Sequence, residues 1–126
     1  MGIRILIVED ELIIADDLAG LLGRMGHEVV GIAIAGREAI DMAAQSNPDL
    51  VLMDVQLQDK MSGAEAACEI QERTGAHIVF VTAFPGALVR KPPRLKEPMV
   101  CVGKPFSRAQ LETALKSVPQ GIRDER

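Results

Sequence analysis

The chain has 126 residues, 48% hydrophobic and 25% charged, which is the size and composition of one ordinary globular domain. A net charge of −4 and only three aromatic residues argue against direct binding of nucleic acid, because the neutralising field and the stacking platforms are both missing. The two cysteines, Cys68 and Cys101, form no metal spacing or disulfide framework, and we expect both to be reduced and buried. Apolar runs such as 5–8 are too short to span a membrane, so we expect a cytoplasmic protein without a membrane partner.

Short apolar or β-branched runs alternate with stretches of helical spacing along the chain. The helical stretches run from Leu12 to near Gly26 and over 37–45, 64–73 and 107–118, the last opening with Ser107 as N-cap. The apolar runs predict strands at 3–8, 28–33, 49–54, 77–82 and 99–102. This alternation predicts an α/β fold with a parallel sheet that helices cover on both faces.

The connection between the last two strands, residues 84–98, breaks the pattern. Four prolines in it exclude an unbroken helix, because each lacks a backbone donor and restricts the residue before it. It also carries four basic side chains: Arg90, Lys91, Arg94 and Lys96. The segment is either a solvated basic loop or a docking surface for an acidic partner.

Polar side chains follow four of the five predicted strands, at the point where each strand ends. They are Glu9 and Asp10 after the first strand, Asp54 at the end of the third, Thr82 at the end of the fourth and Lys104 after the fifth. Each alone is weak evidence, since polar residues are common in turns. Because the carboxyl ends of parallel strands meet at one edge, we expect these five side chains to converge there.

This set of side chains suits phosphoryl transfer. Crowded carboxylates need a cation, and hard oxygen ligands favour Mg²⁺, which then recruits phosphate oxygens. Asp54 as nucleophile would form an aspartyl phosphate, while Lys104 and the metal neutralise the phosphoryl oxygens and Thr82 donates a hydrogen bond. The residues therefore predict phosphorylation of Asp54.

Four motifs make the chain resemble the receiver domain of two-component response regulators from residue 3 to about 118, with 119–126 left as a flexible tail. The motifs are Ile5-Leu6-Ile7-Val8-Glu9-Asp10-Glu11, Pro48-Asp49-Leu50-Val51-Leu52-Met53-Asp54-Val55, Val81-Thr82-Ala83 and Gly103-Lys104-Pro105-Phe106. The resemblance implies a flavodoxin-like, doubly wound sheet of five strands in the order 2-1-3-4-5. It also implies a signalling domain, which catalyses only its own phosphorylation and dephosphorylation and is not an enzyme acting on other substrates.

The resemblance also assigns roles to individual residues. Asp54 would be the phosphoacceptor, and Thr82 and Lys104 would contact the phosphoryl group. Asp10 and Asp54 would bind Mg²⁺, with Glu9 acting through water and the backbone carbonyl of Gln56 completing the ligand set. A cis peptide bond would join Lys104 to Pro105.

Two departures from the family pattern bear on the switch. Cys101 occupies the position three residues before the lysine where receivers usually have Tyr or Phe, and the fourth helix is broken by proline. The motifs around Thr82 and Lys104 are similar to those of atypical alphaproteobacterial receivers of stress and light signalling. The expected partners are a histidine kinase or phosphotransfer protein and a downstream protein that binds the 84–106 face. A DNA-binding output domain is not expected in a chain of this length.

Other functions remain as alternatives. The chain could be a phosphate sink, or a degenerate receiver that serves only as an interaction module. An aspartate-dependent phosphatase would place its nucleophile after the first strand and a second acid two residues later, which Glu9-Asp10-Glu11 fits poorly. A flavin-binding module would need a hydroxyl-rich loop at that point, and these carboxylates would repel the flavin phosphate.

Overall fold

The computed structural model describes residues 2–57, 61–83 and 100–116, which form a five-stranded parallel sheet with helices on both faces. The elements in chain order are β1 (Arg4–Val8), α1 (Leu12–Arg24), β2 (Glu28–Ala33), α2 (Gly36–Ser46), β3 (Leu50–Asp54), α3 (Gly63–Thr74), β4 (His77–Thr82), β5 (Val100–Gly103) and α4 (Arg108–Lys116). The strand order is β2-β1-β3-β4-β5, and every neighbouring pair is parallel. The predicted fold and strand order are confirmed.

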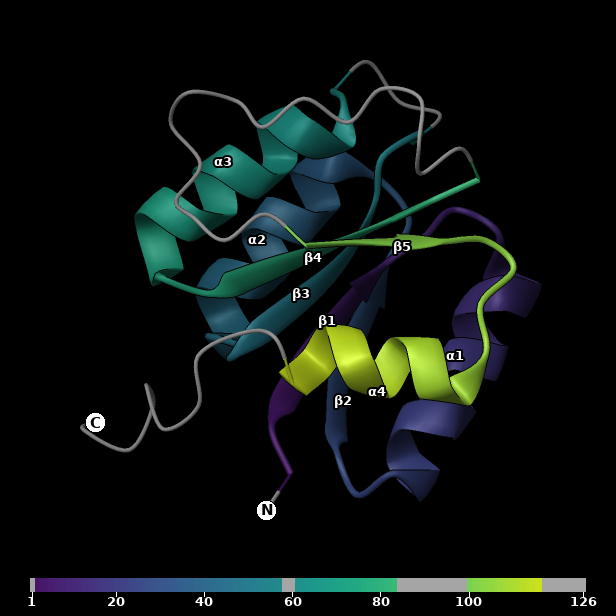
Figure 1. Ribbon diagram of the computed structural model, residues 1–126. Helices are drawn as coiled ribbons and strands as arrows, with labels where there is room; N and C mark the ends of the chain where they lie inside the picture. Colours follow the sequence, from purple (N-terminus) through teal and green to yellow (C-terminus); the bar gives the residue numbers. More distant parts are fainter. Residues whose placement is uncertain (1, 58–60, 84–99, 117–126) are drawn as a thin grey trace.

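The central strands are buried on both sides, because α2 and α3 cover one face of the sheet and α1 and α4 the other (Figure 1). Successive side chains of a strand point to opposite faces. In β1, Leu6 and Val8 therefore pack under α2 and α3, whereas Ile5 and Ile7 pack under α1 and α4. This double burial explains why β1, β3 and β4 read as continuous apolar runs in the sequence.

Both ends of α3 are defined by local chemistry. Ser62 accepts a hydrogen bond from the backbone of Glu65, and the Glu65 side chain accepts one from the backbone of Ser62, which makes a complete capping box. At the other end Gly75 adopts a left-handed conformation with φ of 76°, which glycine tolerates without strain. The helix thus begins and ends at fixed points.

The expected Ser107 cap of α4 is also present. The Ser107 hydroxyl accepts from the Gln110 backbone at 3.1 Å, and the Gln110 side chain accepts from the Ser107 backbone at 2.8 Å. Predicted element ends agree with the structure to within one or two residues where both are described. The basic segment 84–98, the boundary at 118 and the tail 119–126 lie outside the described residues. None of the described helices has the length and apolarity needed to cross a membrane.

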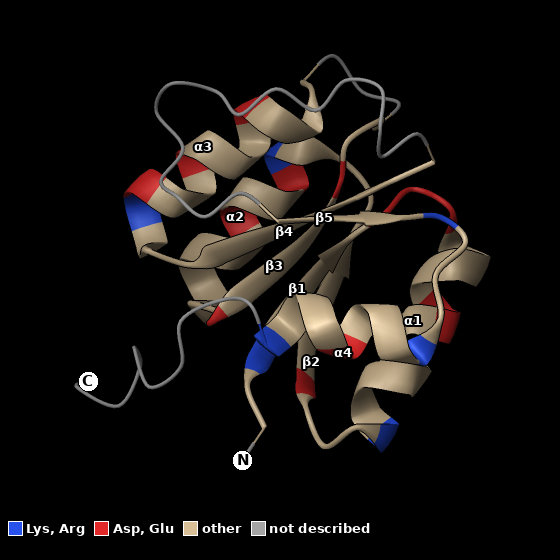
Figure 2. Cartoon of the chain, in the orientation of Figure 1, with Lys and Arg blue, Asp and Glu red and all other residues tan. Residues whose placement is uncertain are grey.

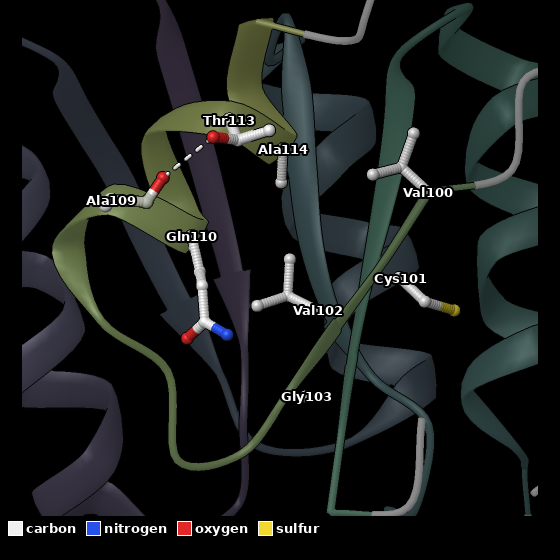
Figure 3. A pocket seen from close by; sticks show the side chains of 8 residues that line it. All are labelled: Val100, Cys101, Val102, Gly103, Ala109, Gln110, Thr113 and Ala114. Atoms are coloured by element: carbon white, nitrogen blue, oxygen red, sulfur yellow. Dashed lines mark hydrogen bonds between the residues drawn. The ribbon is translucent and has the colours of Figure 1, made fainter. Parts of the chain in front are cut away.

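The expectation that both cysteines are buried is wrong for one of them. Cys68 is buried in α3, but Cys101 is exposed. Cys101 lies on β5, at the edge of the sheet, and its neighbour Val102 takes the inward position. In Figure 3 the Val102 side chain points toward α4 while Cys101 points away from it. Successive side chains of a strand point to opposite faces, and on this edge strand that alternation leaves the Cys101 thiol exposed.

Candidate functional site

Five polar side chains meet at the carboxyl-end edge of the sheet, as the sequence predicts. Glu9 and Asp10 follow β1, Asp54 and Thr82 end β3 and β4, and Lys104 follows β5. Carboxylate oxygens of Glu9, Asp10 and Asp54 all lie within 4.8 Å of one another. Figure 2 shows the acidic loop between β1 and α1 beside the basic residue that follows β5.

Lys104 is the cation that faces these carboxylates. Its Nζ donates a hydrogen bond to Glu9 Oε1 at 2.6 Å and lies 3.5 Å from Asp54 Oδ2. The three side chains are largely buried, with Glu9 3% and Asp54 6% exposed. Burial strengthens the attraction, because the surrounding protein screens charge less than water does.

Backbone hydrogen bonds hold the carboxylates in place. The Glu9 backbone N–H donates to the carbonyl of Ala33 on β2 at 2.9 Å, and the Glu11 N–H donates to Glu9 Oε2 at 3.1 Å. The Gln56 N–H donates to Asp54 Oδ1 at 3.0 Å. One carboxylate oxygen of Glu9 thus accepts a hydrogen bond from Lys104, and the other accepts one from the backbone N–H of Glu11.

The loop that carries Lys104 is joined to β4. The Lys104 backbone N–H donates to the carbonyl of Thr82 at 2.7 Å, and the Lys104–Pro105 peptide is cis, as expected. Thr82 itself is 4% exposed. The hydroxyl and the ammonium predicted at this edge are therefore carried by directly bonded backbone segments.

The electrostatics of the site are unbalanced toward negative charge. Burial, with the nearby charge of Glu9, raises the pKa of Asp54 to about 6, against the opposing effects of Gln56 and Lys104. Burial also acts to raise the pKa of Glu9, but the hydrogen bonds from Lys104 and Glu11 outweigh it and the net pKa is lowered. Burial lowers the pKa of Lys104, and its carboxylate partners more than reverse this effect, so that it stays charged.

The donor set fits a hard divalent cation. Three carboxylates offer oxygen atoms in one cluster, and the raised pKa of Asp54 indicates that added positive charge would be stabilising there. Mg²⁺ typically takes one or two carboxylates and keeps waters. Asp10 and Asp54 would be the carboxylates to hold it, because Lys104 Nζ is hydrogen-bonded to Glu9 at 2.6 Å but lies 3.5 Å from Asp54 Oδ2, which leaves that oxygen less engaged.

Three exposed apolar side chains lie on the segments that follow β1 and β2, at the same edge of the sheet, and the sequence pattern did not mark them as exposed. Leu12 and Ile13 open α1 just after the acidic loop, and Ile34 follows Ala33, whose carbonyl holds Glu9. Their exposed fractions are 63%, 80% and 48%, and they are the exposed large hydrophobic residues of the described part of the chain. The helical spacing groups Leu12 with Ala15, Leu18 and Leu22 and so predicts that it is buried, but only the last three are buried in α1 and Leu12 lies outside the core. We call these three residues the apolar rim.

A separate hollow of about 420 Å³ lies between β5 and α4 (Figure 3). It is lined by small or apolar residues of both elements, among them Val100, Val102, Ala109 and Ala114. Thr113 at its margin donates its hydroxyl to the carbonyl of Ala109 at 2.9 Å, as Figure 3 shows. The described residues that line this hollow include no carboxylate and no cation, so it is distinct from the acid site.

Comparison with known proteins agrees with this geometry. The family model of the response regulator receiver domain matches residues 5–116. The chain belongs to the response regulator receiver family. Receivers are signalling domains and not classical enzymes, and the family binds Mg²⁺ at an acidic pocket. This chain has an acidic cluster of Glu9, Asp10 and Asp54.

Among relatives, the receiver is 37% identical to the phyllosphere-induced regulator PhyR of Methylorubrum extorquens over 91% of this chain and 43% of that protein. It is 39% identical to the transcriptional regulatory protein PdtaR of Mycobacterium tuberculosis, over 96% of this chain and 58% of PdtaR. The chain thus spans about half the length of the curated relatives it matches.

Solved structures place it among atypical receivers. The PhyR receiver domain of Erythrobacter litoralis has a TM-score of 0.78 at 31% identity, covering 96% of this chain and 97% of that one. PhyR of Brucella abortus has a TM-score of 0.77 at 38% identity, covering 92% of this chain and 49% of that one.

Proposed function

We propose that this receiver takes a phosphoryl group from a histidine kinase or phosphotransfer protein onto Asp54, with Mg²⁺, and thereby switches a protein-binding surface. The observation that carries the proposal is the position of the Lys104 ammonium, 2.6 Å from Glu9 and 3.5 Å from Asp54, beside three clustered carboxylates. Phosphoryl transfer depends on positioning and charge neutralisation, which this arrangement supplies.

In the reaction, a carboxylate oxygen of Asp54 attacks phosphorus while the bond from phosphorus to the donor's histidine nitrogen breaks. The bonding electron pair leaves with the imidazole. The backbone N–H of Gln56 orients the Asp54 carboxylate by its hydrogen bond. The Lys104 ammonium, now beside Asp54, moves to pair with the phosphoryl oxygens, and the Thr82 hydroxyl can donate a hydrogen bond to one of them. Bound Mg²⁺ would neutralise phosphoryl charge and lower the pKa of Asp54, so that it is ionised at neutral pH.

The apolar rim supports a protein as the phosphoryl donor. Leu12, Ile13 and Ile34 are exposed at the same sheet edge through which a donor must reach Asp54. Exposed carboxylates at Glu11 and Asp16 flank them. A donor surface with an apolar centre and basic side chains around it would complement this edge.

The output is a protein partner bound through the 84–106 face, and the expected location is the cytoplasm. One related structure, from Bartonella quintana, is described as the anti-anti-sigma factor PhyR, at 37% identity and a TM-score of 0.75. A partner in a sigma-factor cascade is therefore the leading class. The same chemistry would also serve a phosphate sink, and the lifetime of the phosphorylated state separates the two roles.

The proposal is tested by labelling the purified protein with acetyl phosphate and measuring its intact mass. We expect one added phosphoryl group in the presence of Mg²⁺, and none in Asp54→Asn or after chelation with EDTA. Labelling that persists in Asp54→Asn would move the acceptor elsewhere, and no labelling of the wild type by any donor would leave the interaction-module alternative.

A further inference from the structure

Gly63, the first residue of α3, lies against the backbone of the phosphoacceptor. It is buried, and its N–H donates to the carbonyl of Val55 at 3.3 Å. A Cβ added at this position would overlap the carbonyl oxygen of Asp54 and would lie 3.0 Å from Val55 Cα. Side-chain carbons do not approach backbone atoms so closely, so only glycine allows this contact.

Helix α3 cannot easily move away to make room for a side chain. Its first turn is held by the capping box of Ser62 and Glu65, and Ala66, Ala67 and Ile70 behind it are fully buried. Close-packed interiors resist such shifts. Strain introduced at position 63 would therefore be transmitted to the other partner in the contact, the end of β3.

The backbone at the end of β3 determines the position of the Asp54 carboxylate in the acid site. The Val55 N–H donates to the carbonyl of Val81 at 3.2 Å, and the Gln56 N–H donates to Asp54 Oδ1 at 3.0 Å. Residues 54–56 are thus held between β4 on one side and Gly63 on the other. A displaced backbone would carry the Asp54 carboxylate away from Lys104 and from the other two carboxylates.

We propose that Gly63 is a positioning residue for the acid site: its lack of a side chain lets α3 set the backbone from Asp54 to Gln56. This inference rests on the proposed function, since it concerns phosphorylation of Asp54 and binding of Mg²⁺ beside it. Gly63 touches neither the phosphoryl group nor the metal, and acts only through the backbone it contacts.

Gly75 provides a matched control, because it lies at the other end of the same helix. Its φ of 76° strains any other residue, but an added Cβ there meets no atom within 4 Å. Gly63→Ala and Gly75→Ala should both destabilise α3, yet only Gly63→Ala should affect the acid site. Each variant is compared with the wild type at a temperature where all three are folded.

For Gly63→Ala we expect roughly tenfold weaker Mg²⁺ binding, as for other residues that orient metal ligands. We expect labelling by acetyl phosphate to slow by about a hundredfold, the effect of misplacing a reacting group by about 1 Å. Gly75→Ala should stay within about twofold of the wild type in both measurements, following the same rules. In metal-free protein, the amide NMR signals of Val55 and Gln56 should shift in Gly63→Ala and not in Gly75→Ala.

Equal Mg²⁺ affinity and labelling in the two variants would show that Gly63 only supports the helix, and would overturn the proposal. If Gly63→Ala unfolds, it is remade together with Gly23→Ala, a substitution on the open surface of α1 that favours helix. Should the wild type bind no Mg²⁺ and accept no phosphoryl group, the proposed function fails. The metal-free amide shifts of Val55 and Gln56 then still decide whether Gly63 positions this backbone.

Discussion

The two ends of the sheet both carry charged side chains, but these side chains have different partners. At the amino end, Asp49 accepts from the Arg4 backbone at 2.8 Å, and the Arg4 side chain donates to the carbonyl of Asn47 at 3.1 Å. His27 Nδ1 there accepts from the Ile3 backbone at 3.1 Å. At the carboxyl end, Glu9, Asp10 and Asp54 cluster together, and among the described residues Lys104 pairs with Glu9 and Asp54.

The difference shows how a structural polar group can be told from a functional one. Side chains at the amino end bond to backbone groups and so fasten loops to strands. Carboxylates at the other end face one another, which leaves the pKa of Asp54 raised to about 6. Negative charge that the protein itself does not balance is stabilised by a cation, which is why we propose the carboxyl end as the functional edge.

The sharpest test of this comparison removes one carboxylate from each end. Asp10→Asn should abolish the dependence on Mg²⁺ and slow labelling by acetyl phosphate by about a hundredfold, because the proposed direct metal ligand is lost. Asp49→Ala should label at the wild-type rate while unfolding more easily, since it loses the hydrogen bond that fastens the loop to β1 and does not touch the acid site. Labelling that falls equally in both variants would remove the distinction between the two ends.

Replacement of the cation should affect rate and stability together. Lys104→Ala should slow labelling by roughly 10- to 100-fold, because a group that stabilises developing charge is removed. Without Mg²⁺ it should also lose about 2 kcal/mol of unfolding free energy, as the Glu9 carboxylate would lose its charged hydrogen-bond donor. Chemical denaturation with and without Mg²⁺ measures this, and Mg²⁺ should restore most of the loss. A variant that labels normally would exclude the role given to Lys104.

A smaller effect is expected at the apolar rim, and it should depend on the donor. Ile13→Asp should slow transfer from a phosphorylated histidine kinase by about tenfold, because an interface side chain becomes charged and adds to the acidic surface. The kinase to use is the one that labels the wild type fastest in a profiling panel. Acetyl phosphate is the internal control, since labelling by this small donor should not change. Equal slowing with both donors would indicate damage to the site and not to docking.

The smallest expected effect is a gain in stability. In metal-free protein at pH 7, Asp54→Asn should raise the unfolding free energy by about 1–2 kcal/mol, because it removes a carboxylate whose ionisation burial disfavours. The asparagine oxygen can still accept the hydrogen bond from Gln56. Denaturation of the two proteins in EDTA measures the difference.

The pH dependence of that gain has a definite sign. The folded-state pKa of Asp54 is raised from 3.8 to about 6, so its contribution to wild-type stability is present below pH 3.8 and is lost as the pH rises through 6. The difference in unfolding free energy between the wild type and Asp54→Asn should therefore grow between pH 4 and pH 7 and be absent at lower pH. A gap independent of pH would mean that Asp54 is not the titrating group.

Much of this fold can be predicted from the sequence because its determinants are local. Continuous apolar runs mark strands buried on both faces, Ser62 and Ser107 mark helix starts, and parallel topology brings Glu9, Asp10, Asp54, Thr82 and Lys104 to one edge. The identity of the acid site follows from these positions alone. Its roles in phosphorylation and metal binding remain predictions.

Only the tertiary structure decided the features that depend on packing between distant segments. The exposure of Cys101 follows from the place of β5 at the sheet edge. The exposure of the apolar rim follows from the positions of the first residues of α1 and of the residue after β2, which lie outside the core. The contact of Gly63 with Asp54 is the clearest case, because a glycine before a helix reads in the sequence as an ordinary helix start. Local pattern specifies which elements form, but how closely two backbones approach is set by the assembled core around them.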